Sequence, residues 1–170
     1  MSRKLKFIAD TMLGSLARWL RMLGYDTLYS RDYSDKEILE LASKDSRIIL
    51  TRDLSLHRKA QKRNLRSIYL ENETIQGKLT LLALKLKINL ELNPDNSRCP
   101  ICNGILVRAS KEDVLNRVPE KIIELHENFW ICTSCGKVYW KGKHWITMNK
   151  ILSEVRERIT HEREKSGCIK

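Results

Sequence analysis

Short apolar runs alternate with amphipathic segments through the first ninety residues or so of the chain. The apolar runs predict strands buried in a sheet that is covered on both faces. The expected strands lie at residues 5–9, 25–29, 48–50 and 67–70. Between and after them, apolar residues recur at helical spacing in segments 13–24, 38–42, 54–63 and 74–87. Strands that alternate with helices predict an α/β fold with a parallel sheet and right-handed crossovers.

Two local features of these helices can be read from the pattern. Ser34 or Asp35 is expected to cap the second helix, with Glu37 in its first turn. In the last of these helices the apolar residues face inward, so Lys78 is expected to face solvent.

The pattern changes after a turn-rich segment, Asn93-Pro94-Asp95-Asn96-Ser97. Beyond it come two cysteine pairs and, between them, a polar helix-like piece at 111–117 that Pro119 ends. The final segment, roughly 147–165, predicts a charged helix with one apolar stripe. We therefore divide the chain into an α/β domain at 1–95, a small cysteine domain at 96–146 and a charged helix at 147–170.

Four of the five cysteines form two Cys-x-x-Cys pairs, which are Cys99, Cys102, Cys132 and Cys135. In a protein that we expect to be cytosolic, this spacing favours a metal site over disulfides. Four thiolates suit a structural, tetrahedral Zn²⁺ and leave no open coordination position for catalysis. Each pair predicts a tight turn that ends with glycine, at Gly104 and Gly136, where the backbone needs a positive φ. Cys168 is left over.

Charge changes the picture further, because the 170 residues carry a formal net charge of +11. Such an excess indicates a polyanionic partner such as nucleic acid, although a generally basic surface is the plainer alternative. No apolar run approaches the roughly 20 residues that span a bilayer, and no signal-peptide core follows the N-terminus. We therefore expect a cytoplasmic protein with no membrane partner.

Carboxylates follow two of the predicted strands, Asp10 after the first and Asp53 after the third. Ligands of open α/β sheets bind outside the carboxyl ends of strands, so both acids are candidates for a metal or catalytic site. A third acid is expected before the second helix, with Asp35 first and then Asp32 and Glu37. Such oxygen ligands suit Mg²⁺ or Mn²⁺ and hydrolysis of phosphodiesters, whereas a helix cap is the plainer role for Asp35.

Basic and aromatic residues are the candidates for binding a polyanion. Arg18 and Arg21, three residues apart, are expected to share a helix face away from the leucines, where they hold phosphate or are simply solvated. Arg52 directly precedes Asp53. Near the second cysteine pair, cations alternate with aromatic rings, which fits RNA or, alternatively, a cover for the zinc-bound core. The candidates in this segment are Lys141, Lys143, His144 and Trp145.

Taken together, several of these motifs resemble the Mut-seven-C family of PIN-like RNases. The resemblance is carried by Phe7-Ile-Ala-Asp10, the run from Leu13 to Asp26, Asp35-x-x-Ile-Leu and Ile49-Leu-Thr-Arg-Asp53. It extends through both cysteine pairs and Val138-Tyr-Trp-Lys-Gly-Lys-His-Trp145, and so covers nearly residues 5–150.

The resemblance implies a PIN-like sheet followed by a small four-cysteine zinc ribbon and a C-terminal helix. It also implies a metal-dependent ribonuclease in which Asp10, Asp35 and Asp53 are catalytic and bind Mg²⁺ or Mn²⁺, with Arg18 and Arg21 near the substrate. We accordingly expect hydrolysis of RNA, tRNA or rRNA among the candidates, with the ribbon and basic surface holding it. The alternative is an RNA-binding module without catalysis.

Overall fold

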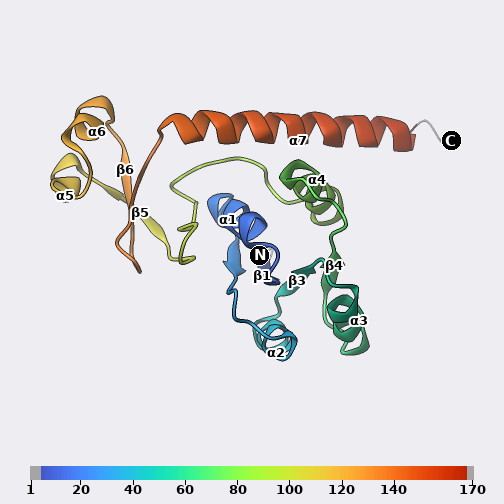
Figure 1. Cartoon of the computed structure of the whole chain (residues 1–170). Helices are drawn as coiled ribbons and strands as arrows, with labels where there is room; N and C mark the ends of the chain where they lie inside the picture. Colours follow the sequence, from blue (N-terminus) through green and yellow to red (C-terminus); the bar gives the residue numbers. More distant parts are fainter. Residues whose placement is uncertain (1–4, 168–170) are drawn as a thin grey trace.

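The computed structural model describes residues 5–167 (Figure 1), so Cys168 lies outside the described residues. Four parallel strands form the first sheet, in the order β2-β1-β3-β4. They are β1 (Lys6–Ala9), β2 (Asp26–Leu28), β3 (Ile48–Thr51) and β4 (Ser67–Tyr69). The helices that connect and follow them are α1 (Gly14–Met22), α2 (Asp35–Asp45), α3 (Leu54–Lys62) and α4 (Ile75–Leu86). The predicted α/β alternation is confirmed.

Alternation of side chains along the central strands gives the sheet two buried faces. In β3, Ile48 and Leu50 belong to a large core with α1 and α4, whereas Ile49 joins a smaller core with α2 and α3. All three side chains are at most 2% exposed. The continuous apolar run is therefore explained by helices on both faces, as expected for parallel strands.

The helix boundaries follow local signals closely in this half. Ser34 is the N-cap of α2, and its side chain and that of Glu37 form a capping box. The Ser34 amide donates to Glu37 Oε2 at 2.8 Å, and the Glu37 amide donates to Ser34 Oγ at 3.3 Å. Asp35 is thus the first residue of the helix rather than its cap. Thr74 caps α4 by accepting from the Gly77 amide at 3.1 Å.

The second sheet has three antiparallel strands in the order β5-β6-β7 and lies at one end of the molecule in Figure 1. Its strands are β5 (Leu106–Ala109), β6 (Phe129–Cys132) and β7 (Val138–Trp140). Two short helices, α5 (Lys111–Val114) and α6 (Glu120–Leu125), lie between β5 and β6. The expectation that Pro119 ends a helix was wrong: α5 has already ended, and Pro119 is the N-cap of α6.

The last helix, α7 (Lys143–Gly167), begins earlier than the predicted position near residue 147 and runs along the α/β part (Figure 1). Its stripe of Leu152, Val155 and Ile159 is buried in the large core, where α7 packs against α4. A side chain of α7 also reaches the connection between the two sheets, since Arg156 donates to the Leu90 carbonyl at 3.0 Å. The helix therefore completes the hydrophobic core of the first sheet.

Candidate active site and metal centre

Chain topology brings two of the predicted acids to the same edge of the first sheet. After β1 the chain crosses to β2 on one side, whereas β3 lies on the other side of β1. The carboxyl ends of β1 and β3 therefore flank the point where the strand order reverses, which is where open α/β sheets bind ligands. Asp10 follows β1 and Asp53 follows β3, and the Asp10 amide donates to the Leu50 carbonyl at 3.0 Å.

Asp10 is only 5% exposed, and its carboxylate accepts three hydrogen bonds. The Met12 amide donates to Oδ1 at 3.0 Å, the Arg52 amide donates to Oδ2 at 2.9 Å, and the Thr51 hydroxyl also donates to Oδ2. Three donors on one carboxylate leave it little freedom to rotate. The side chain is thus held rigidly at the strand end.

Asp53 is exposed and serves as the N-cap of α3. Its Oδ1 accepts from the Ser55 amide at 2.6 Å and from the Leu56 amide at 3.3 Å. Both hydrogen bonds end on the same oxygen of the carboxylate. A helix cap is the plainer role that an aspartate at a strand end can have, and the site role of Asp53 stays a prediction.

Asp35 forms an ion pair with Lys59 of α3, with 2.8 Å between Asp35 Oδ2 and Lys59 Nζ. The hydrogen bond to Asp35 is the main cause that raises the pKa of Lys59, and the charge of Asp53 raises it further. Lys59 therefore lies within the electrostatic reach of both acids. The sequence did not single out this lysine, because on a basic helix nothing distinguishes it from its neighbours.

The other two acids proposed from the sequence have different environments. The carboxylate of Glu37 accepts hydrogen bonds from the Ser34 hydroxyl and then from the Ser34 amide, and both lower its pKa. Asp32 is exposed in the loop before α2. Among residues 5–167, the three aspartates do not form a compact group of metal-ligating atoms; such a group is made only by the cysteines.

A buried lysine stands near this edge, contrary to the expectation that it faces solvent. Lys78, at the beginning of α4, is 8% exposed and donates to the Glu73 carbonyl at 2.5 Å. Burial lowers its pKa, and the nearby charge of Arg52 lowers it further. Arg52, Lys59 and Lys78 thus add positive charge around the strand ends that carry the acids.

The four paired cysteines converge on one point, with all of their sulfur atoms within 4.8 Å of one another. The sulfur atoms of Cys99 and Cys135 are 3.7 Å apart, and those of Cys102 and Cys132 are 3.4 Å apart. A compact set of four thiols is the donor set of a structural zinc site. The prediction of a four-cysteine metal centre is confirmed in its geometry.

Hydrogen bonds and close backbone approach shape this cluster. Burial opposes ionisation of the Cys99 thiol, but the Tyr139 hydroxyl, 3.0 Å away, and backbone N–H groups lower its pKa to about 7. In the first turn, Asn103 rather than glycine has the positive φ, of 68°. Gly104 is needed for a different reason: a Cβ there would lie 2.7 Å from the Cys132 sulfur. The second turn does use glycine as expected, with Gly136 at φ 72°.

Arg21 corrects the expectation that it shares a solvent face with Arg18. Arg18 is exposed, but Arg21 is 4% exposed and points into the junction between the two sheets. Its guanidinium donates to the Thr27 carbonyl at 2.9 Å and to the carbonyls of Pro100 and Ile101 at 2.9 and 3.0 Å. Arg21 is therefore a structural link to the first cysteine turn, and contact with RNA is no longer expected of it.

A second link uses Asn103 of the same turn. Its side-chain amide donates to Asp26 Oδ1 at 2.8 Å and accepts from the Thr27 amide at 3.1 Å. Asp26 also makes a bidentate pair with Arg47, at 2.9 and 3.1 Å. Burial would raise the pKa of Asp26, but the hydrogen bonds from Arg47 and Asn103 lower it. Asp26 begins β2, so the cysteine part docks at the amino end of this strand, opposite the edge with Asp10.

The basic and aromatic residues after the second cysteine pair lie where β7 passes into α7. Lys141 Nζ is 5.1 Å from the centre of the Trp145 ring and 5.9 Å from that of Trp130, which are cation–π distances. Lys143 and His144 are exposed in the first turn of α7. Both rings thus have a cationic partner within the chain, and of the two only Trp145 is partly exposed.

Comparison with known families agrees with this arrangement of an α/β sheet with acids at its carboxyl edge and a four-cysteine ribbon. These features define a two-part protein, an α/β sheet followed by a small sheet with a four-cysteine cluster. The family model described as the Mut7-C RNAse domain matches residues 5–152, and the chain belongs to this family. No curated protein and no solved structure matches the chain. Within residues 5–167, no helix combines the length and apolar character needed to cross a membrane.

Proposed function

We propose that this chain is a PIN-like ribonuclease that hydrolyses RNA with the help of Mg²⁺ or Mn²⁺ held at the carboxyl edge of the first sheet. The observation that carries the proposal is the position of Asp10 and Asp53 after adjacent strands at the reversal of strand order. Membership of an RNase-domain family supplies the reaction class. The ligands we propose are Asp10, Asp53 and, from the start of α2, Asp35.

The donor set fits such a cation, since carboxylate oxygens are the ligands that Mg²⁺ and Mn²⁺ prefer. When bound, the cation would supply a water of lowered pKa and would stabilise charge on the phosphate oxygens. Asp10 contributes a carboxylate whose orientation is already set by three donors. Asp35 gives up part of its ion pair with Lys59 when it serves as a ligand.

Cations of the chain would orient the RNA strand at this edge. Arg52 and Lys59 lie beside the acids, and positive charge next to a carboxylate site favours a phosphodiester over a neutral substrate. We propose that Arg18, exposed on α1, adds a phosphate contact. The four-cysteine centre, which we assign to Zn²⁺, has a structural role: its four thiols leave no position for substrate.

The test is cleavage of a labelled pool of tRNA and rRNA by the wild type and Asp53→Asn in parallel. The arms contain Mn²⁺, Mg²⁺ or EDTA. In one further arm the protein receives Zn²⁺ as its only metal after treatment with EDTA, because chelation also threatens the cysteine site. We expect products with Mn²⁺ or Mg²⁺ and none with Zn²⁺ alone. Asp53→Asn should reduce cleavage by about 100-fold or more, in the range seen when one transition-state stabilising group is lost.

Stability separates this catalytic effect from unfolding. Asparagine is as good an N-cap as aspartate, so Asp53→Asn should change the free energy of unfolding by less than about 0.5 kcal/mol. Glu124→Gln, which removes a negative charge from exposed α6, is the matched control and should cleave like the wild type. Equal cleavage by the wild type and Asp53→Asn would contradict the proposal.

The second candidate is an RNA-binding module without catalysis. It is favoured by the structural partners that all three aspartates already have: a strand-end network, a helix cap and an ion pair. In that case RNA binding would be salt-dependent, with no products in any metal arm.

A further inference from the structure

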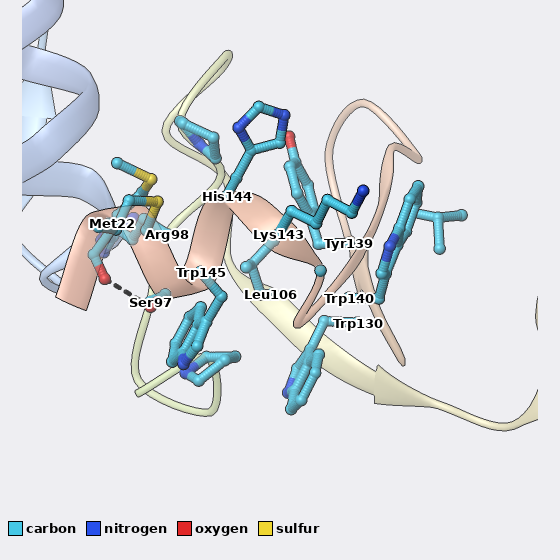
Figure 2. A pocket seen from close by; sticks show the side chains of 15 residues that line it. Met22, Ser97, Arg98, Leu106, Trp130, Tyr139, Trp140, Lys143, His144 and Trp145 are labelled. Carbon is cyan, nitrogen blue, oxygen red and sulfur yellow. Dashed lines mark hydrogen bonds between the residues drawn. The ribbon is translucent and has the colours of Figure 1, made fainter. Parts of the chain in front are cut away.

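A hollow of about 450 Å³ lies between the cysteine-bearing sheet and the start of α7 (Figure 2), and none of the three aspartates lines it. Its walls come from separate parts of the chain. Trp130 and Trp140 are supplied by β6 and β7, Trp145 by α7, and Met22 by the end of α1. The volume is in the range of small-molecule sites and exceeds what a single planar ring needs.

Most of the lining is aromatic or apolar, and its charged members, Arg98 and Lys143, are both basic. Arg98, Lys143 and His144 line the hollow, and no Asp or Glu is among the described residues that do so. The nearest acid in sequence is Asp95, whose carboxylate is engaged by Arg108 and by the Trp130 indole, and these hydrogen bonds lower its pKa to about 2. Flat aromatic walls with a cationic rim match a nucleobase attached to a phosphate backbone.

The rings are held in place by the surrounding chain. Trp130 Nε1 donates to Asp95 Oδ1 at 2.9 Å, which fixes its edge. A Cβ at residue 142 would lie 3.0 Å from Trp140 Nε1, so Gly142 lets this ring pack close to the backbone turn before α7. That turn is closed by the Trp145 amide, which donates to the Gly142 carbonyl at 2.9 Å. The aromatic side chains are therefore already held in place before a ligand ring enters.

We propose that this hollow, the aromatic pocket, binds one unstacked base of a single-stranded RNA, with the exposed Lys143 contacting the adjoining phosphate. The inference rests on the proposed function in that RNA is the partner, and it adds a base-binding site that is separate from the acidic edge. Asp10 precedes α1 and Met22 ends it, and the nine residues of α1 span about 14 Å at about 1.5 Å per residue, which sets the scale of the distance between the two sites. Arg18, exposed on α1, lies between them in sequence. A strand of a few nucleotides can span this distance.

The test compares a short oligouridylate with an abasic oligomer of the same length, which has the same phosphates and no bases. Both are titrated into the zinc-loaded wild type without Mg²⁺ or Mn²⁺. Tryptophan fluorescence reports on the pocket directly, because three of the four tryptophans line it and the fourth, Trp19, is in the core. We expect the oligouridylate to bind at least about fivefold more tightly and to quench the fluorescence, as stacking of one base predicts.

Variants separate base stacking from charge. Trp140→Leu should remove the preference for the oligouridylate and leave binding of the abasic oligomer unchanged. Lys143→Gln should weaken the binding of both oligomers by the same factor. Lys150 is exposed further along α7, and Lys150→Gln is the matched control, which should weaken binding less. Circular dichroism and zinc content of Trp140→Leu show that the variant is folded.

Each other outcome has a defined meaning. Equal affinity for the two oligomers contradicts base binding in the aromatic pocket, even if RNA is cleaved in the metal arms. A preference for the oligouridylate without cleavage supports the pocket and contradicts hydrolysis. Concentration-dependent dimers that Trp140→Leu abolishes, together with equal oligomer affinities, would assign the hollow to self-association and overturn the proposal.

Discussion

The cysteine cluster and the acidic edge are two candidate metal centres that differ in how far they are assembled in the chain itself. The four cysteine sulfur atoms already lie within 4.8 Å of one another. The three aspartates instead have separate partners, with Asp10 in a network of donors, Asp53 at a helix cap and Asp35 beside Lys59. The two centres also lie at opposite ends of the parallel strands.

This difference has a physical cause. Each Cys-x-x-Cys pair is formed within one tight turn, and pairing of β5 with β6 brings the two turns together. The acids come from three strand-to-helix connections, so their separation depends on the whole sheet. Each carboxylate also has hydrogen-bond donors of its own, which hold the three acids in separate places.

The largest expected effect is the loss of the cysteine centre. Cys132→Ser removes a buried ligand of the proposed zinc site, and because structural zinc supplies folding free energy, unfolding of the β5–β7 sheet should follow. Zinc content by mass spectrometry should fall to a small fraction of the wild-type value, with loss of the near-ultraviolet signal of Trp130 and Trp140. Cys168→Ser is the control, because Cys168 belongs to neither Cys-x-x-Cys pair, and it should retain zinc. Full zinc occupancy in Cys132→Ser would contradict a four-cysteine centre.

A smaller effect tests whether the cluster is assembled locally. Arg21→Met removes three hydrogen bonds, two of them across the junction, and leaves the buried Thr27 carbonyl without this donor. We expect a destabilisation of about 3 kcal/mol in urea denaturation, with zinc content retained because the cysteine turns are intact. Arg18→Met, on the exposed side of the same helix, should change stability by less than about 0.5 kcal/mol. If Arg21→Met lost its zinc, the cluster would depend on docking rather than on its own turns.

The smallest effect is a pH dependence that belongs to the same junction. The pKa of Asp26 is lowered in the folded chain, so its contribution to stability is present above the ordinary value of 3.8 and is lost as the pH falls through the lower, folded value. Asp26→Asn should therefore be less stable than the wild type at neutral pH. This difference should shrink below about pH 4, as thermal unfolding followed over a pH series can show. Asp32→Asn is the exposed control, and a constant difference over the whole series would argue against the Arg47 pair as its source.

Much of the fold follows from local patterns in the chain. The strand around Ile49 could be recognised because its apolar residues are consecutive, as in a strand buried on both faces. The caps of α2 and α4 could be recognised because a serine and a threonine directly precede these helices. The start of α7 was misjudged by about four residues. Its first turn carries Lys143 and His144 and is exposed, so the apolar periodicity becomes visible only further along the helix.

The candidate sites were predictable to different degrees. The positions of Asp10 and Asp53 follow from the rule that acids after parallel strands gather at one edge. Arg21 could not be separated from Arg18 by spacing, because only the docked cysteine turn distinguishes their environments. Lys78 was placed in solvent for a related reason: the pattern of one helix does not show what its neighbours cover.

The amino-acid sequence by itself determines the alternation of strands and helices, the four-cysteine centre and the basic character of the protein. These depend on periodicity, on spacing within single turns and on composition, which are all local. Tertiary structure alone decided that the cysteine part docks at the amino end of β2, that α7 completes the core of the first sheet, and that aromatic rings from three elements enclose a pocket. These outcomes depend on contacts between residues far apart in the chain, which arise only when the two sheets and their helices pack together.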